Sequence, residues 1–214
     1  ALIAAVILRE HPESTIVTDS VTSDGLAKFI ADRNGKHHRF RRGYKNVINE
    51  SLRLNENGEE SWLAIETSGH AALRENYFLD DGAYLVAKLI VEAACLRKEG
   101  KELQDLIADL QQPVESKEIR FKIDTDDFKT YGEQVLEHIK AAAEKEHDWQ
   151  LVSPNYEGVR IACTDEKEQG WFLLRQSLHD PVLPLNIESN VEGGVSRITD
   201  RVLALLSDFK ALKQ

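Results

Sequence analysis

The sequence predicts two domains of different fold class: an α/β domain with a mainly parallel sheet over residues 1–112, then a small α+β domain over residues 117–214. Strand-like and helix-like segments alternate up to about residue 110, which implies parallel strands joined by right-handed crossovers. A polar, proline-containing stretch, residues 111–116, then separates two periodic regions. Beyond it, strand-like runs are grouped between two flanking helices, which indicates a mainly antiparallel sheet.

The elements of the first domain are predicted from side-chain periodicity and from local stop signals. The β-branched run at 14–18 and the apolar run from Trp62 to Ile65 are typical of strands. The glycine of Glu99-Gly100-Lys101 ends the longest helix. In chain order we expect an apolar helix ending near His11-Pro12, a strand at 14–18, a helix carrying Leu26, Phe29 and Ile30, a strand at 37–41, a helix at 46–54, a strand from Trp62, a helix at about 82–98 and a short helix at 102–110.

The second domain is predicted to begin with a strand near residues 118–121 and a helix at about 127–146. Three strand-like runs follow, at 149–152 continuing into 158–162, at 171–174 and at 183–188. A final amphipathic helix at about 194–212 carries apolar residues at helical spacing: Ile198, Val202, Leu205, Leu206 and Phe209.

The composition, with 42% hydrophobic residues in 214, allows a substantial core. The formal net charge of −10 argues against a nucleic-acid partner, because such binding depends on neutralising phosphates. The opening apolar run, residues 1–8, is too short to span a bilayer, so no membrane partner is expected. Cys95 and Cys163 lie in apolar surroundings, and we expect two buried, reduced thiols in a cytoplasmic protein.

The most informative stretch is Glu66-Thr67-Ser68-Gly69-His70, which directly follows an apolar strand. Because open α/β sheets bind ligands at the carboxyl ends of their strands, this stretch is a candidate ligand site. Glu66 and Ser68 alternate onto one face of an extended chain, and a carboxylate near a hydroxyl suits the vicinal diol of a sugar. The alternative is a structural turn in which both side chains only satisfy backbone groups.

Two motifs together resemble a known family. The stretch at 66–70 resembles the Glu-x-Ser-Gly-His sugar loop of the α-D-phosphohexomutases, the phosphoglucomutase and phosphomannomutase family. The helix that begins near Asp81-Gly82 follows at a similar distance in that family. Residues 170–177 resemble the strand and the Arg-x-Ser start of the family's C-terminal phosphate-binding loop. The resemblance covers only the family's third and fourth domains.

The resemblance also implies parts that this sequence does not contain. The family carries its phosphorylated serine in a Thr-Ala-Ser-His-Asn-Pro type loop and its metal in an Asp-Gly-Asp-Gly-Asp-Arg loop, and neither string occurs here. The chain also lacks methionine. We therefore interpret it as the C-terminal half of a longer polypeptide, with Mg²⁺ expected from the absent second domain and no metal ligand in this half. The expected partners are a hexose phosphate and the missing N-terminal domains.

By this resemblance Glu66 and Ser68 bind the hexose, and His70 is the expected catalytic residue. The family's matching histidine lies close to the reacting phosphate, where an imidazole can donate a hydrogen bond or exchange a proton near neutral pH. The alternative for His70 is a histidine of the core.

A densely basic run, residues 36–45, should attract an anion locally within this acidic chain. At this position the family has a Val-Gly-Asp-Arg or Val-Gly-Asp-Lys motif whose cation faces the substrate, so the resemblance carries over to Gly43 and Lys45. Arg39 and Arg41 would share one face of a strand if Phe40 points inward. The alternative for the two arginines is a solvated strand edge.

The third candidate, residues 175–181, reads Arg-Gln-Ser-Leu-His-Asp-Pro, where the family typically has Arg-x-Ser-Gly-Thr-Glu-Pro. The family's loop holds the substrate's non-transferred phosphate, which implies phosphate contacts by Arg175, Ser177 and His179. A guanidinium can bind phosphate oxygens bidentately. Leu178 replaces a glycine, so we expect a different backbone path. The alternative is an ordinary turn with an arginine at a strand edge.

The implied activity is reversible transfer of a phosphoryl group between O1 and O6 of glucose or mannose, with this half binding the substrate and inactive alone. The alternative from another class is a non-catalytic sugar-phosphate binding module. A serine hydrolase is not indicated, because Ser68 and His70 are too close on an extended segment and no Gly-x-Ser-x-Gly motif is present.

Overall fold

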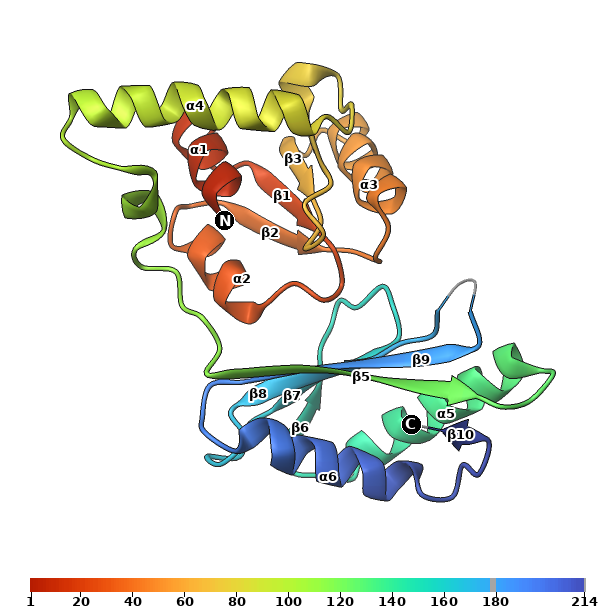
Figure 1. The fold of residues 1–214 in the computed structure, drawn as a ribbon. Helices are drawn as coiled ribbons and strands as arrows, with labels where there is room; N and C mark the ends of the chain where they lie inside the picture. Colours follow the sequence, from red (N-terminus) through yellow and green to blue (C-terminus); the bar gives the residue numbers. More distant parts are fainter. Residues whose placement is uncertain (178–179, 214) are drawn as a thin grey trace. The chain divides into compact units, whose positions relative to one another are not determined.

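The computed structural model describes residues 1–177 and 180–213. The chain divides into two compact units, Ala1–Gln111 and Gln112–Gln214, and each is shown in Figure 1. Within the described ranges, no helix is long and apolar enough to cross a membrane.

Unit 1 is built on a four-stranded sheet in the order β2-β1-β3-β4. Strands β1 (Thr15–Thr18), β2 (Lys36–Arg39) and β3 (Ser61–Ile65) run parallel, and β4 (Ala71–Leu73) pairs antiparallel with β3. The helical elements are α1 (Leu2–Glu10), α2 (Asp24–Ala31), α3 (Tyr44–Glu56), η1 (Arg74–Asn76), α4 (Gly82–Lys98) and η2 (Leu103–Ile107). The carboxyl ends of the three parallel strands therefore meet at one edge of the sheet.

Helices cover both faces of this sheet (Figure 1). On one face α1, α2 and α4 pack with Ile16 of β1 and Leu63 of β3. On the other face α3 packs with Val17 of β1 and Ala64 of β3. Neighbouring strand residues thus enter different cores, because successive side chains of a strand point to opposite faces.

The described residues of unit 2 form a six-stranded antiparallel sheet in the order β10-β5-β9-β8-β7-β6, with two helices packed on one face (Figure 1). Its elements are β5 (Glu115–Ile123), α5 (Phe128–Ala143), β6 (Trp149–Leu151), β7 (Val159–Cys163), β8 (Gly170–Leu174), β9 (Val182–Ser189), α6 (Gly194–Leu206) and β10 (Leu212–Lys213). Alternate residues of β5, namely Ile119, Phe121 and Ile123, enter the core beneath α5 and α6. The predicted class, α/β followed by α+β, is confirmed.

Several element boundaries differ from the expectation. Strands β4 and β10 were not predicted, because segments of 3 and 2 residues show no periodicity. The basic strand ends at Arg39, so Arg41 lies beyond it and the two arginines do not share a strand face. The last helix ends at Leu206, and the chain turns there to pair β10 with β5.

The expectation of two buried thiols is wrong for Cys95. Both cysteines are free, but Cys95 is exposed and only Cys163 is buried. On α4 the buried position is Leu96, the next residue. One step along a helix turns the side chain by about 100°, so Cys95 points away from the core.

Candidate functional site

Side chains from three segments meet at the carboxyl edge of the parallel strands in unit 1. β1 is followed by Asp19, β2 leads to Gly43, and β3 is followed by Glu66 and Thr67. Hydrogen bonds join Gly43 to Glu66 and Thr67 to Asp19. The topology thus brings together the predicted sugar loop and the Gly43 motif, although they lie 23 residues apart.

Glu66 is 8% exposed, and both oxygens of its carboxylate have neighbours. Oε1 accepts from the backbone N–H of Gly43 at 2.6 Å. Oε2 lies 3.4 Å from the Ser68 hydroxyl, which is long for a bond between oxygens. One oxygen therefore holds the loop, and the other can accept from a ligand hydroxyl.

Gly43 has a backbone conformation that residues with a side chain rarely adopt. It is the N-cap of the 13-residue helix α3, with φ 117°, in the region that disfavours other residues. Its N–H points to the carboxylate of Glu66. Anionic side chains are favoured at a helix N-terminus by the helix dipole, so the Glu66 carboxylate suits its position at the start of α3.

The chain turns sharply between Glu66 and β4. The Gly69 N–H donates to the Glu66 carbonyl at 3.0 Å, and the Glu66 N–H donates to the His70 carbonyl at 2.9 Å. Gly69 has φ 94°, which explains the glycine. Ser68 lies at the tip of this turn and is exposed, so its hydroxyl is accessible beside Glu66.

Asp19 was not among the predicted site residues, yet it supports the sugar loop. Its side chain is fully buried. Oδ2 accepts from the N–H and the hydroxyl of Thr67 at 3.1 and 2.7 Å, and Oδ1 accepts from the Thr22 hydroxyl at 2.9 Å. A buried carboxylate requires such donors. One signal was available in the sequence: Asp19 follows β1 as Glu66 follows β3, at the same edge of the sheet.

The imidazole of His70 is held by two neighbours. Nδ1 lies 2.8 Å from Oδ2 of Asp80, and the ring stacks on Tyr44 with 5.3 Å between ring centroids. An ionised carboxylate only accepts, so Nδ1–H donates and Nε2 is the nitrogen available to a ligand. The side chain of His70 is 54% exposed, so the alternative of a core histidine is wrong.

The two aspartates after the loop have separate structural roles. Asp80 also accepts from the Ala71 N–H at 3.2 Å. Asp81 is the N-cap of α4 and accepts from the N–H groups of Ala83 and Tyr84 at 3.0 and 3.1 Å. The hydrogen bond from the Tyr84 N–H is the main reason why the pKa of the Asp81 carboxyl lies below its usual value.

The arginines of the basic run are engaged with neighbouring side chains. Arg39 pairs with Asp24 at 2.8 Å. The guanidinium of Arg41 lies over the ring of Phe40, at 5.3 Å from its centroid. Since Arg41 lies beyond the end of β2, these two arginines do not share one anion-binding strand face.

Lys45 differs from these arginines because it belongs to the first turn of α3. Its side chain is exposed, and its ammonium lies 5.9 Å from the centroid of the Tyr44 ring. Tyr44 also stacks on His70. This tyrosine, which the sequence analysis did not single out, thus contacts both predicted residues.

In unit 2 the predicted phosphate residues continue the hairpin of β8 and β9 beyond the strands. The Arg175 N–H donates to the Pro184 carbonyl at 3.1 Å, and the Ser177 N–H donates to the Val182 carbonyl at 3.0 Å. The chain therefore stays extended, and the side chains of Arg175 and Ser177 point to the same face.

The Ser177 hydroxyl accepts from the Asp180 N–H at 3.3 Å. Nη1 of Arg175 lies 3.9 Å from Oε1 of Glu157, at the limit of an ion pair. Leu178 and His179 lie outside the described residues, so the phosphate contact of His179 stays a prediction.

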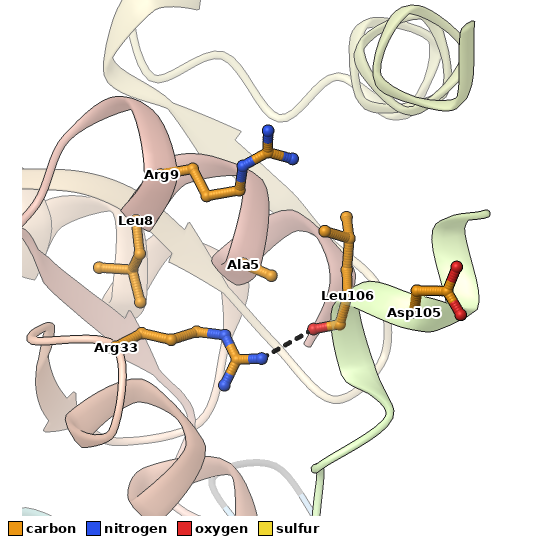
Figure 2. A pocket seen from close by; sticks show the side chains of 6 residues that line it. All are labelled: Ala5, Leu8, Arg9, Arg33, Asp105 and Leu106. Carbon is orange, nitrogen blue, oxygen red and sulfur yellow. Dashed lines mark hydrogen bonds between the residues drawn. The ribbon is translucent and has the colours of Figure 1, made fainter. Parts of the chain in front are cut away.

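A cavity of ≈ 280 Å³ in unit 1 lies apart from all predicted site residues (Figure 2). It is lined by Ala5, Leu8, Arg9, Arg33, Asp105 and Leu106. Nη2 of Arg33 donates to the Leu106 carbonyl at 2.9 Å, and Arg9 pairs with Glu92. Because both guanidinium groups are bonded within the chain, we interpret the cavity as a packing gap between helical segments.

Comparisons with known proteins agree with the fold and the motifs. The family model described as "Phosphoglucomutase/phosphomannomutase, alpha/beta/alpha domain III" matches residues 1–114. A phosphomannomutase/phosphoglucomutase of Pseudomonas syringae pv. tomato is 28% identical over 199 residues, covering 92% of this chain and 38% of that protein. A phosphomannomutase of Methanocaldococcus jannaschii is 27% identical over 215 residues, covering 99% of this chain and 42% of that protein. The chain thus spans well under half the length of these curated relatives.

Solved structures share the fold. A phosphoglucomutase/phosphomannomutase family protein from Burkholderia thailandensis matches with a TM-score of 0.74 at 24% identity, over 97% of this chain and 40% of that chain. An Aspergillus fumigatus N-acetylphosphoglucosamine mutase in complex with GlcNAc-6P and magnesium matches with a TM-score of 0.56 at 10% identity, over 96% of this chain and 45% of that chain. At such identities the likeness concerns the fold alone.

Proposed function

The chain belongs to the phosphoglucomutase/phosphomannomutase family, and we propose that it is the sugar- and phosphate-binding half of a phosphohexomutase. Such an enzyme moves a phosphoryl group reversibly between O1 and O6 of a glucose or mannose phosphate. The observation that carries this proposal is the Glu66 carboxylate, held by Gly43 on one oxygen and placed beside the Ser68 hydroxyl with the other. A fold hosts many functions, so the proposal depends on this site.

The hexose is proposed to bind at Glu66 and Ser68. Oε2 of Glu66 can accept from one sugar hydroxyl, and the Ser68 hydroxyl can donate to or accept from its neighbour. These two oxygens lie 3.4 Å apart, so binding replaces only a weak internal contact. The bond from Gly43 holds the carboxylate in place before the sugar arrives, which lowers the ordering cost of binding.

The non-transferred phosphate is proposed to bind at Arg175 and Ser177, with His179 as a further donor. The guanidinium can bind two phosphate oxygens, and the serine hydroxyl can donate to a third. Since this phosphate keeps its charge during the reaction, these contacts orient the substrate and take no part in bond breaking. In unit 1, Lys45 beside Gly43 is proposed to face the sugar or the reacting phosphate as a point charge.

His70 is proposed to act at the reacting phosphate. Asp80 holds Nδ1–H, so Nε2 can donate a hydrogen bond when the ring is protonated and accept a proton when it is neutral. Stacking on Tyr44 restricts the rotation of the ring and so keeps Nε2 in one direction. Positioned groups of this kind supply much of the advantage in phosphoryl transfer.

The residues described here do not fit a magnesium site. Within residues 1–177 and 180–213, no group of three or more His, Cys, Asp or Glu side chains is placed to hold a metal ion. The carboxylates of Asp80 and Asp81 are taken up by His70 and by the start of α4, whereas Mg²⁺ requires several free oxygens in octahedral geometry. We therefore assign Mg²⁺ and the phosphoserine to preceding domains of a longer polypeptide.

We also propose partners and a cellular location for the chain. Its partners are the hexose phosphate and those preceding domains, since this chain matches 38% and 42% of the length of two curated relatives. Its two free cysteines support a reducing, cytoplasmic location.

The second candidate function is a non-catalytic sugar-phosphate binding module. It is favoured by one observation: neither the family's phosphoserine string nor its metal string occurs in these 214 residues. The two candidates differ in what precedes the chain in its gene. A reading frame that encodes both strings upstream supports the mutase, and a frame without them supports the module.

The proposal is tested by ³¹P NMR of glucose 1-phosphate with the purified 214-residue chain, Mg²⁺ and glucose 1,6-bisphosphate. We expect the phosphate resonance to broaden or shift on binding, with no glucose 6-phosphate formed. Formation of glucose 6-phosphate by this chain alone would contradict the division of roles between the domains. A resonance that is unaffected at every protein concentration would contradict the binding site itself.

A further inference from the structure

Gln176 lies between the two predicted phosphate residues but points in the opposite direction. Phe172 and Leu174 of β8 belong to the core beneath α5 and α6. The chain remains extended through Ser177. Alternation therefore places Gln176 on the helix side of the sheet and Arg175 on the other side.

The side-chain amide of Gln176 is bonded to the first turn of α5. Nε2 donates to the carbonyl of Phe128 at 3.2 Å and to that of Lys129 at 3.3 Å. Gly132, also in α5, is buried beside it. A Cβ at Gly132 would lie 2.8 Å from both Cδ and Nε2 of Gln176, closer than real Cβ atoms approach. The amide thus occupies the space that a Cβ at position 132 would enter, and a larger residue there would force the amide to move.

This contact explains a glycine that the helix itself disfavours. Glycine inside a helix is less stable than alanine, because it loses more conformational freedom on folding. Gly132 does not have a positive φ, so its backbone conformation does not require glycine. The side chain of Gln176 supplies the physical reason for its presence.

A second glycine restricts the same segment from the β7 side. Gly158 precedes β7 and has φ 58°. A Cβ there would overlap the Leu174 carbonyl oxygen and lie 2.8 Å from Cα of Arg175. The backbone at Leu174 and Arg175 is therefore confined by Gly158, next to β7, while Gln176 is bonded to α5.

We propose that the Gln176–Gly132 contact positions the phosphate loop and thereby sets its affinity for a phosphate group. Gln176 is a positioning residue: its bonds to α5 fix the backbone between Arg175 and Ser177, and so fix the direction of those two side chains. Without this contact the loop must be ordered when the anion binds, which weakens binding. The inference rests on the proposed phosphate site.

The test compares Gly132→Ala, Gln176→Met, Gln176→Ala and the double variant Gly132→Ala/Gln176→Ala with the wild-type chain. Gly82→Ala in α4 is the matched control, since a Cβ there meets nothing within 4 Å. Calorimetric titration with inorganic phosphate and with glucose 1-phosphate gives Kd. Amide hydrogen exchange at Ser177 and Tm are measured on the same samples.

We expect Gly132→Ala and Gln176→Met to raise Kd for both ligands by roughly five- to tenfold, as for the loss of one hydrogen-bonded contact. Exchange of the Ser177 N–H should become faster, and Gly82→Ala should match the wild type in Kd. With Gln176→Ala already present, Gly132→Ala should leave Kd unchanged and raise Tm, because the added methyl group no longer meets the glutamine. The effect of Gly132→Ala on Kd should therefore depend on the residue at position 176. This dependence separates a positioning role from general damage to the fold.

If Gly132→Ala and Gln176→Met both keep the Kd and the Ser177 exchange rate of the wild type, the positioning role is overturned. The proposed phosphate site would still stand. An equal loss of affinity in Gly82→Ala would also overturn it, because that residue is in unit 1. Failure of the wild-type chain to bind either ligand would overturn the phosphate site, and this inference with it.

Discussion

The backbone N–H of Gly43 donates to Oε1 of the Glu66 side chain at 2.6 Å, and this bond joins two strand-end motifs of unit 1. It uses one carboxylate oxygen for the structure of the loop and leaves the other, Oε2, beside Ser68. Substitutions at Glu66 can therefore separate a structural role from a sugar-binding role.

Glu66→Gln should weaken sugar binding with little effect on stability. The amide keeps an oxygen for the Gly43 N–H but replaces the anionic acceptor at Oε2. The loss of one charged hydrogen bond, about 1.5–3 kcal/mol, corresponds to a Kd for glucose 1-phosphate that is roughly ten- to a hundredfold weaker. Titration calorimetry and thermal unfolding measure the two effects. Unchanged affinity together with a lower Tm would show that the loop is only structural.

Asp19→Ala should destabilise unit 1 and also weaken sugar binding. The substitution removes the acceptor for Thr67 and Thr22 in a fully buried place, which costs about 1–3 kcal/mol of the free energy of unfolding. Urea unfolding measures this cost. Asp24→Ala is the control, because its exposed pair with Arg39 contributes at most about 1 kcal/mol. Equal effects of the two substitutions would contradict the supporting role of Asp19.

Arg175→Lys should weaken phosphate-containing ligands selectively. Lysine keeps the charge but loses the planar fork that binds two oxygens, so Kd for glucose 1-phosphate should rise about tenfold. Binding of glucose without phosphate should not change. Arg120→Lys on β5, where the side chain is 70% exposed, is the control. If Arg175→Lys binds glucose 1-phosphate like the wild type, this loop is not the phosphate site.

A thiol reagent such as DTNB should modify one cysteine of the native chain and two after unfolding. Cys95 is exposed, whereas Cys163 is 3% exposed and its burial raises the pKa of the thiol. The thiolate is the reacting species, so Cys163 should not react in the native state. Cys95→Ser should abolish the native reaction. Two equivalents released before unfolding would contradict the packing of Cys163.

The stability of unit 2 should fall in acid through Asp148. Arg201 donates to both oxygens of this carboxylate, at 2.7 and 3.0 Å, and these bonds lower the pKa of Asp148 in the folded state. The stabilisation is therefore present above the ordinary aspartate pKa of about 4 and is lost as pH falls through the lower folded value.

Asp148→Asn tests this directly. At pH 7 the free energy of unfolding should fall by about 1–2 kcal/mol, and the difference from the wild type should shrink as pH falls below about 4. Urea unfolding between neutral pH and strong acid measures both. A difference that stays constant over the whole range would show that ionisation of Asp148 is irrelevant to stability.

The elements that the sequence predicted well have strong local signals. Helix α4 was expected at about 82–98 and runs over Gly82–Lys98, because Asp81 caps its start and Gly100 follows its end. Strands β1 and β3 were recognisable from a short β-branched run and a short apolar run between helices, whereas β2 is a basic segment. Strands β4 and β10 have too few residues for any periodicity, so only pairing with β3 and β5 defines them.

The predicted site residues came from motif resemblance, but their supporting contacts did not. Asp19 and Thr67 are 48 residues apart, as are Gln176 and Phe128. Such pairs depend on how strands and helices meet in three dimensions. The position of Asp19 directly after β1 indicated the correct edge of the sheet, but not its partner Thr67. Nothing in the sequence indicated that Gln176 contacts α5.

We propose above all that unit 1 binds the sugar at Glu66 and Ser68 while unit 2 binds the phosphate at Arg175 and Ser177. The most direct measurement is an NMR titration of the ¹⁵N-labelled chain with glucose, with inorganic phosphate and with glucose 1-phosphate. We predict amide shifts at residues 66–70 with both glucose-containing ligands, shifts at residues 175–177 with both phosphate-containing ligands, and shifts in both segments with glucose 1-phosphate. Unshifted amides at residues 66–70 under saturating glucose 1-phosphate would contradict the account.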